Sequence, residues 1–195
     1  MFESAVLKLE EARVILDQLQ TATDSALFRS QFNSFLSAAR AVTNALQKEG
    51  ADVDGFADWY AAKQAEMRAD GLMRFIHEAR IEDFHQGKHR LTFSTYVAHM
   101  NTKDAGPPPA PGASLVIGAD GVFWVVDSGT PNERRIPATG GTVTVAIGID
   151  NPPETHLGQR IETNPIEICT LALTYLDSLV HEANTRFGGE APPGL

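Results

Sequence analysis

The chain has 195 residues, of which 43% are hydrophobic and 21% are charged, a balance that suits one globular domain with a full core. This composition excludes a disordered chain, and the single cysteine, Cys169, excludes a small disulfide-stapled scaffold. The sequence has no apolar run close to the roughly 18 residues of a membrane span, and its acidic, amphipathic start is unlike a signal peptide. We therefore expect a cytoplasmic protein with no membrane partner.

The formal net charge is −9, from 16 Lys and Arg against 25 Asp and Glu. A generally acidic surface repels phosphate backbones, which disfavours non-specific binding to duplex nucleic acid. The charge is unevenly distributed, because residues 61–90 hold six Lys and Arg against five Asp and Glu. The sequence therefore leaves room for one local, phosphate-sized site in this segment.

Apolar residues recur at three- and four-residue steps through the first half of the chain, which predicts amphipathic helices. The predicted ranges are 3–20, 24–49 and 54–87. Asp24 is suited to the N-terminal cap of the second helix. We expect a kink or break in the third helix at Asp70-Gly71, because glycine weakens a helix by about 1 kcal/mol relative to alanine.

From Arg90 onward the hydrophobic period changes to two, which is typical of strands. Strands are predicted at 91–96, on both sides of Asp120-Gly121, and at 141–149. The dipeptide Asp120-Gly121 between two apolar runs predicts a hairpin, because both residues tolerate positive φ. We expect three to five strands in one small antiparallel sheet.

The last helix is well marked, because Asn164-Pro165 supplies a capping residue and a proline at the first helical position. Cys169 lies on its apolar seam, where we expect it to pack as a small hydrophobic residue. The predicted fold class is α+β: a bundle of about four helices with a small antiparallel sheet inserted before the last helix. We expect a single domain. Its predicted parts are the bundle (1–89), the β-rich insertion (90–162), the last bundle helix (163–188) and a flexible tail (189–195).

The segment from His77 to Arg90 holds three of the six histidines and is the main candidate for a functional site. One interpretation is a metal site built from Glu82, His85 and His89, with the Glu-x-x-His spacing of di-iron bundles. Such bundles need a second Glu-x-x-His pair, and the sequence has none. We therefore expect no metal and no cofactor, and keep a metalloprotein as the weaker alternative.

A second interpretation rests on Arg80 and His85, an arginine and a histidine separated by four residues. In this spacing the sequence resembles the HEPN superfamily of small helical bundles, whose motif lies late in the bundle. The segments 28–42 and 56–60 also look like helices of bacterial members. The resemblance covers about residues 1–90 and has no counterpart for the strand-rich region.

The resemblance implies metal-independent RNA cleavage or nucleotide binding, often at a site formed across a homodimer. Arg80 would hold a phosphate, because its guanidinium is permanently charged, and His85 would exchange protons near neutral pH. Lys88, His89 and Arg90 would help to bind the substrate. The implied partners are RNA or a nucleotide and a second copy of the chain.

A non-catalytic interpretation stays open beside it. On a regular helix, five residues turn through 500°, so Arg80 and His85 point about 140° apart. Arg80 has acidic neighbours in Glu78, Glu82 and Asp83 for ordinary surface ion pairs, and His85 suits the C-terminal end of a helix. In that case the protein is a binding module of unknown ligand that performs no chemistry.

Overall fold

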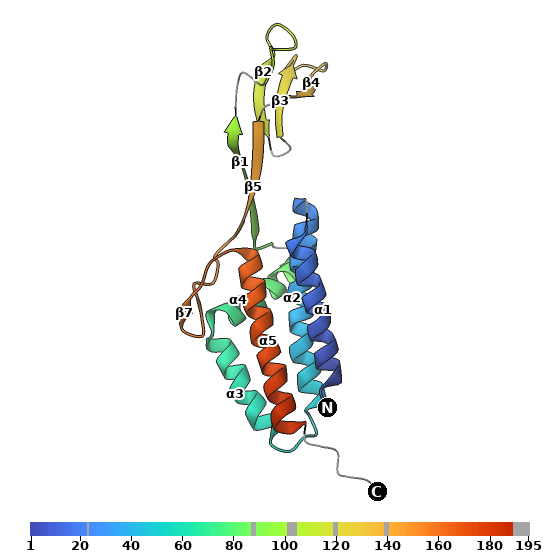
Figure 1. The fold of residues 1–195 in the computed structure, drawn as a ribbon, viewed down its shortest axis with the longest axis vertical. Coiled ribbons are helices and arrows are strands. Elements are labelled where there is room, and N and C mark those ends of the chain that lie inside the picture. Colours follow the sequence, from blue (N-terminus) through green and yellow to red (C-terminus); the bar gives the residue numbers. More distant parts are fainter. Residues whose placement is uncertain (23, 87–88, 101–104, 119–120, 139–140, 189–195) are drawn as a thin grey trace. The chain divides into compact units, whose positions relative to one another are not determined.

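The computed structural model describes residues 1–22, 24–86, 89–100, 105–118, 121–138 and 141–188. Its helices are α1 (Glu3–Gln20), α2 (Ser25–Glu49), α3 (Phe56–Ala69), α4 (Gly71–Gln86) and α5 (Pro165–Phe187). Its strands are β1 (Leu91–Met100), β2 (Ser114–Gly118), β3 (Gly121–Val126), β4 (Arg134–Pro137), β5 (Gly141–Ile149), β6 (Thr155–His156) and β7 (Gln159–Arg160). The predicted α+β class is therefore confirmed, with α5 following the strands (Figure 1).

The helices begin where polar side chains cap them. The Asp24 carboxylate accepts a hydrogen bond from Leu27 N at 2.8 Å, and α2 follows directly. The Asn164 side chain accepts one from Ile166 N at 2.8 Å, and Pro165 is the first residue of α5. Both caps confirm the sequence prediction, because each satisfies a backbone N–H that has no partner inside its helix.

The main core lies among α1, α2 and α5, which run side by side (Figure 1). Large, fully buried side chains fill it: Phe32, Phe35, Leu36, Leu46, Leu19, Ile168 and Leu176. Cys169 is completely buried, and burial raises the pKa of its thiol, so it packs as predicted. Among the described residues, no helix has both the length and the apolar character to cross a membrane.

The third predicted helix is two helices, α3 and α4, that meet at Asp70. The backbone of Asp70 is extended, with φ −75° and ψ 130°, and its side chain accepts a hydrogen bond from Met73 N at 2.9 Å. Asp70 therefore ends α3 and caps α4. The break falls where the sequence predicted it, and the buried carboxylate rather than Gly71 alone fixes its geometry.

The described strands form three sheets: β1 with β5, β2–β3–β4, and β6 with β7. The predicted hairpin is the antiparallel pair β2–β3, in which Gly118 lies opposite Gly121. Gly121 is thus a strand residue, and Asp120 lies outside the described residues. The sequence predicted one sheet and missed β6–β7, because two-residue strands are too short to show an alternation.

The chain forms two compact units, Met1–Thr92 with Ile149–Leu195, and Phe93–Gly148. The β6–β7 hairpin belongs to the helical unit, so this unit takes in residues 149–162 of the predicted insertion. The expectation that both units belong to a single domain stays a prediction.

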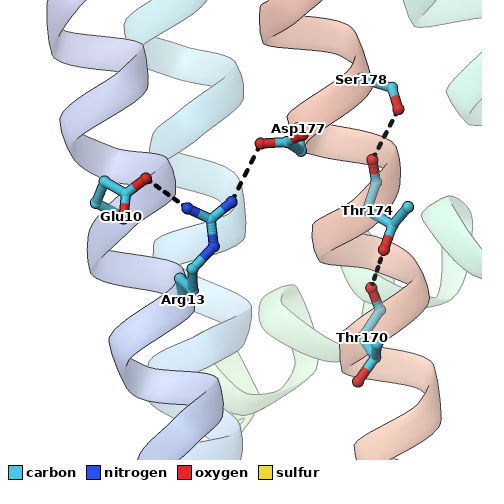
Figure 2. Close-up of polar contacts among 6 residues, drawn as sticks. All are labelled: Glu10, Arg13, Thr170, Thr174, Asp177 and Ser178. Carbon is cyan, nitrogen blue, oxygen red and sulfur yellow. Dashed lines mark hydrogen bonds and ion pairs between the residues drawn. The ribbon is translucent and has the colours of Figure 1, made fainter.

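A polar cross-link on the surface of the helical unit joins α1 to α5 (Figure 2). The guanidinium of Arg13 binds Glu10 on its own helix and Asp177 on α5, the latter at 3.2 Å. These side chains are about half exposed, so the pair adds little stability.

Candidate functional site

A cleft of about 280 Å³ opens on the helical unit between α2, α3 and α4. Its lining combines cationic, polar and apolar side chains. The lining residues are Leu36, Ala39, Arg40, Thr43, Gln64, Met67, Arg68, Met73, Arg74, Ile76, His77 and Arg80. The volume is close to the lower end of the range of small-molecule sites in proteins.

Helical spacing places the cationic groups. Arg74, His77 and Arg80 follow one another at three-residue steps, so they lie along one side of α4. Arg40 faces them from α2, and Arg68 comes from the last turn of α3. Five groups that are cationic, or become so on protonation, therefore meet at one cleft from three helices.

The cleft has a strongly positive lining. Among the described residues that line it there is no Asp or Glu, although the chain holds 25 of them. Arg40 Nη1 lies 3.3 Å from the Thr43 hydroxyl, and the exposed Arg74 is 4.0 Å from Glu78. Arg68 makes no ion pair within the described part of the chain. The positive charge is therefore only partly neutralised by protein groups.

The floor of the cleft is apolar. Leu36 and Ala39 come from α2, Met67 from α3, and Met73 and Ile76 from α4, and all except the half-buried Met67 are buried. Methionine side chains are flexible and polarisable, so they adapt to flat or irregular surfaces. The arrangement offers an anion site at the rim and an apolar surface below it.

Of the five residues that the sequence singled out, the structure describes the side chains of Arg80, His89 and Arg90. Arg80 lines the cleft. His85 lies in α4, but its side chain and the whole of Lys88 are outside the described residues. His89 is exposed, with Nδ1 3.5 Å from the side-chain amide of Asn33 on α2. Arg90 does not line the cleft, and its guanidinium donates two hydrogen bonds to Glu82, at 2.6 and 2.7 Å.

The sequence analysis did not identify the other cationic residues that line the cleft with Arg80. Arg40 and Arg68 lie on other helices, so no local spacing links them to it. Arg74 and His77 did carry a signal, because both precede Arg80 on the same helical face. The three-residue step from His77 to Arg80 would have been a better guide than the five-residue step to His85.

The metal interpretation stays a prediction, because the side chain of His85, one of its three ligands, lies outside the described residues. In the described part of the chain, no three His, Cys, Asp or Glu side chains are grouped so that they could hold a metal ion. Glu82, one of the proposed ligands, forms the two short hydrogen bonds with Arg90. The backbone carbonyl of Arg90 also accepts a hydrogen bond from Asp150 N at 2.7 Å. Because Glu82 belongs to α4, these contacts tie residues 90 and 150 of the helical unit to that helix.

A second cavity of about 210 Å³ lies on the other side of α3, next to α5. Its charged groups are paired: Lys63 contacts Glu182 at 2.9 Å and Glu66 at 3.4 Å. The Tyr175 hydroxyl donates a hydrogen bond to the Glu66 carboxylate at 2.9 Å. Burial is the main cause that raises the pKa of Tyr175, and the Glu66 carboxylate raises it further.

The hydroxyl groups beside this second cavity are engaged as well. Thr174 and Ser178, which line the cavity, each donate to the carbonyl oxygen four residues earlier on α5, at 2.9 and 3.0 Å (Figure 2). Thr170, one turn earlier, does the same at 2.9 Å. Each hydroxyl proton is therefore committed to the helix backbone. The second cavity presents a satisfied polar network rather than reactive or attracting groups.

Fold and cleft together define an α+β protein whose helical unit carries a cationic, ligand-sized site. The family model described as bacteriophage lambda protein ea47 matches residues 9–119, more than half of the chain, and the chain belongs to this family. The matched segment contains every residue that lines the cleft. No curated protein and no solved structure matches the chain.

The family match corrects the resemblance to the HEPN superfamily, which was wrong. That resemblance rested mainly on Arg80 and His85, and one arginine and one histidine on an amphipathic helix are a short and common pattern. The roles of these residues therefore have to be argued from the cleft itself.

Proposed function

We propose that the cleft between α2, α3 and α4 binds a small ligand that carries a phosphate group and a flat or apolar organic part, as a nucleoside monophosphate does. The observation that carries the proposal is the lining: four arginines around an apolar floor, with no described carboxylate among them. A protein that concentrates positive charge in this way, while its net charge is −9, favours an anionic ligand at that place.

The chemistry of the lining fits both parts of such a ligand. Guanidinium groups bind phosphate oxygens with two parallel hydrogen bonds and also stack on flat rings. Met67 and Met73 provide soft apolar contacts for a base, and Gln64 provides an amide that can both donate to and accept from a base edge. Inorganic phosphate would leave this apolar surface unused.

The size of the cleft favours a small ligand over a long nucleic acid. Its volume of about 280 Å³ holds one small molecule, whereas a polynucleotide needs a basic surface that follows its backbone. Outside the cleft the chain is more acidic than its net charge suggests, because four of its 16 Lys and Arg lie in the lining. A nucleotide ligand also agrees with the cytoplasmic location that the composition predicts. The homodimer that the sequence analysis expected stays a prediction.

Calorimetric titration with AMP, adenosine and inorganic phosphate tests the proposal. We expect AMP to bind more tightly than phosphate, and adenosine to bind at least tenfold more weakly than AMP, because one charge-assisted hydrogen bond contributes about 1.5–3 kcal/mol. Arg40→Gln and Arg80→Gln should each weaken AMP binding about tenfold or more. Arg13→Gln is the matched control, since Arg13 lies on α1 and binds Glu10 and Asp177.

Equal binding of AMP and adenosine would contradict the proposal, because the arginines would then have no part in recognition. Unchanged AMP affinity in both Arg40→Gln and Arg80→Gln would contradict it as well. If AMP fails to bind, the same titration with GMP, CMP and UMP decides whether the base was the wrong one. Failure of all four nucleotides would remove the proposal.

A second candidate function is cleavage of a small phosphodiester, favoured by the position of His77. This histidine lines the cleft between Arg74 and Arg80, where it could exchange a proton while the guanidinium groups hold the phosphate. We propose an assay of dinucleotide and RNA cleavage in the presence of chelator, with His77→Ala and His85→Ala in parallel. Loss of cleavage in His77→Ala alone would assign the role to the cleft, and loss in His85→Ala alone would restore the sequence prediction.

A further inference from the structure

One buried carboxylate, that of Asp70, joins three segments at the corner where α3 meets α4. Its Oδ1 accepts hydrogen bonds from Met73 N at 2.9 Å and from His156 Nδ1 at 3.0 Å. Its Oδ2 accepts one from Leu157 N at 2.7 Å. Asp70 therefore caps α4 and at the same time holds the β6–β7 hairpin, which contains His156 and Leu157, against this corner.

The Asp70 side chain is only 5% exposed, and it is held as a carboxylate. Burial by itself raises the pKa of Asp70, but the hydrogen bonds from Leu157, Met73 and His156 outweigh it and leave the pKa below its usual value. The His156 ring is also buried and packs edge-on against Tyr175, with the ring centres 5.8 Å apart.

The hairpin lies so close to the start of α4 that only glycine fits there. A Cβ atom on Gly71 would lie 2.8 Å from the carbonyl oxygen of Thr155 and 3.1 Å from its hydroxyl. The first of these distances is too short for a carbon and a backbone oxygen that cannot swing away. Gly71 and Asp70 thus act together, since one admits the hairpin and the other binds it.

This corner lies between two parts of the cationic cleft. Met67 and Arg68 line the cleft immediately before Asp70, and Met73 and Arg74 line it immediately after. Met73 is also the residue whose N–H binds the Asp70 carboxylate. The separation between Arg68 and Arg74 across the cleft therefore depends on the angle that Asp70 imposes on α3 and α4.

We infer that Asp70 is a positioning residue for the cationic cleft, and that the β6–β7 hairpin holds it in place by way of His156, Leu157 and Gly71. The inference rests on the proposed function, because it assigns a role in ligand binding to residues that do not line the cleft. The hairpin thereby becomes part of the binding apparatus on the opposite side of the helix corner.

Two variants release the hairpin without changing any residue of the cleft. Gly71→Ala inserts the Cβ atom that Thr155 excludes, while alanine is the better helix former, so α4 itself is not weakened. His156→Ala removes one hydrogen bond to Asp70 and leaves the cap on Met73 intact. We expect each variant to weaken AMP binding about tenfold at 25 °C, which is the expected effect of losing one well-placed charged contact.

Two controls separate positioning from general destabilisation. Leu157→Asn lies in the same hairpin, where the leucine side chain is 59% exposed, and it keeps the backbone N–H that binds Asp70, so its AMP affinity should equal that of the wild type. Leu9→Ala creates a cavity in the buried face of α1 and should lower the melting temperature without changing AMP affinity.

A second readout needs no ligand. The side-chain Nε–Hε NMR signals of Arg68 and Arg74 should move in Gly71→Ala and His156→Ala and stay in place in both controls. If these signals move but AMP and the other nucleotides do not bind the wild type, the positioning role stands and the proposed function falls. Unmoved arginine signals together with unchanged AMP affinity in both hairpin variants would overturn the inference.

Discussion

Two cavities flank α3, and they treat charge in opposite ways. The cleft towards α2 and α4 has four arginines in its lining and no described carboxylate. The cavity towards α5 has Lys63 between Glu66 and Glu182, and both carboxylates receive further hydrogen bonds, from Tyr175 and Trp59. The second arrangement ties α3 to α5, and its charged groups are already paired with one another instead of being open to a ligand.

The difference shows how a structural polar network can be told from a binding site on one small bundle. A network of alternating charges satisfies itself, so it contributes to helix packing and attracts no ion. A set of like charges gathered at a cleft repels itself and lowers the stability of the free protein, unless a ligand of opposite charge is present. The number of opposite charges in the lining, rather than the number of charges, distinguishes the two.

Gln64→Glu tests this comparison most severely. The change is nearly isosteric and places a carboxylate among the arginines of the cleft, as in the second cavity. We expect AMP affinity to fall about 100-fold, because the new charge pairs with a guanidinium and repels the phosphate. The melting temperature should be unchanged or higher. Calorimetric titration and thermal unfolding measure both effects.

Gln64→Met serves as its uncharged control and should bind AMP within about threefold of the wild type, since a methionine–base contact replaces one neutral hydrogen bond. Wild-type AMP affinity in Gln64→Glu would show that the arginines do not hold the phosphate. Equal losses in both variants would show that the amide, and not the charge, is what matters.

The fold could be predicted from the sequence to the extent that its elements carry local signals. The caps at Asp24 and Asn164 and the break at Asp70 were visible, because each depends on a few neighbouring residues. The β6–β7 hairpin was not visible, since its position depends on the buried contact between His156 and Asp70, 86 residues apart. His156 is isolated in the sequence and acquires a role only through this contact.

Of the residues that line the candidate site, the sequence analysis singled out Arg80 and missed the others, because the site is assembled from three helices. Arg80 was singled out by its spacing to His85 within the segment 77–90, through a resemblance that was wrong. Arg40 lies 40 positions earlier on α2, where an arginine beside alanines looks like a solvated side chain. Only the packing of α2 against α4 brings the two together.

Asp70→Asn should have the next largest effect, on stability rather than on charge balance. The amide nitrogen of asparagine would face a backbone N–H, so we expect a loss of about 2 kcal/mol in the free energy of unfolding at pH 7. The pKa of Asp70 is lowered in the folded protein. Its contribution is therefore fully present above the unfolded pKa of about 3.9 and is lost as the pH falls through the lower folded value.

Urea unfolding at neutral pH and at about pH 3 measures this contribution, since carboxylates titrate between these values. The difference between the wild type and Asp70→Asn should narrow at the lower pH. Asp58→Asn, a change of an exposed aspartate in the first turn of α3, should follow the wild type at both. A constant difference across the two pH values would mean that Asp70 is not the carboxylate on which the corner depends.

Glu182→Gln should have a smaller effect, because it removes one charge from the self-satisfied network of the second cavity. The ion pair between Lys63 and residue 182 is lost. The amide oxygen can still accept the hydrogen bond from Trp59 Nε1, which is 2.7 Å long in the wild type. The Glu182 side chain is 43% exposed, so water screens the pair and we expect a loss of less than about 1 kcal/mol. AMP affinity should be unchanged. A clear change in AMP affinity would show that the two cavities are coupled through α3.

The last prediction concerns how strongly salt ions screen the individual arginines of the cleft. Arg68 and Arg74 are exposed, whereas Arg40 and Arg80 are half-buried, and ions screen exposed charges more strongly. Raising the NaCl concentration from roughly 0.05 to 0.5 M should therefore weaken AMP binding only about threefold to tenfold. Arg68→Gln should flatten this dependence, because it removes a screened contribution. Arg80→Gln should lower affinity at every salt concentration and leave the slope nearly unchanged. Identical slopes in both variants would mean that the exposed and the half-buried arginines of the cleft do not differ in their access to salt.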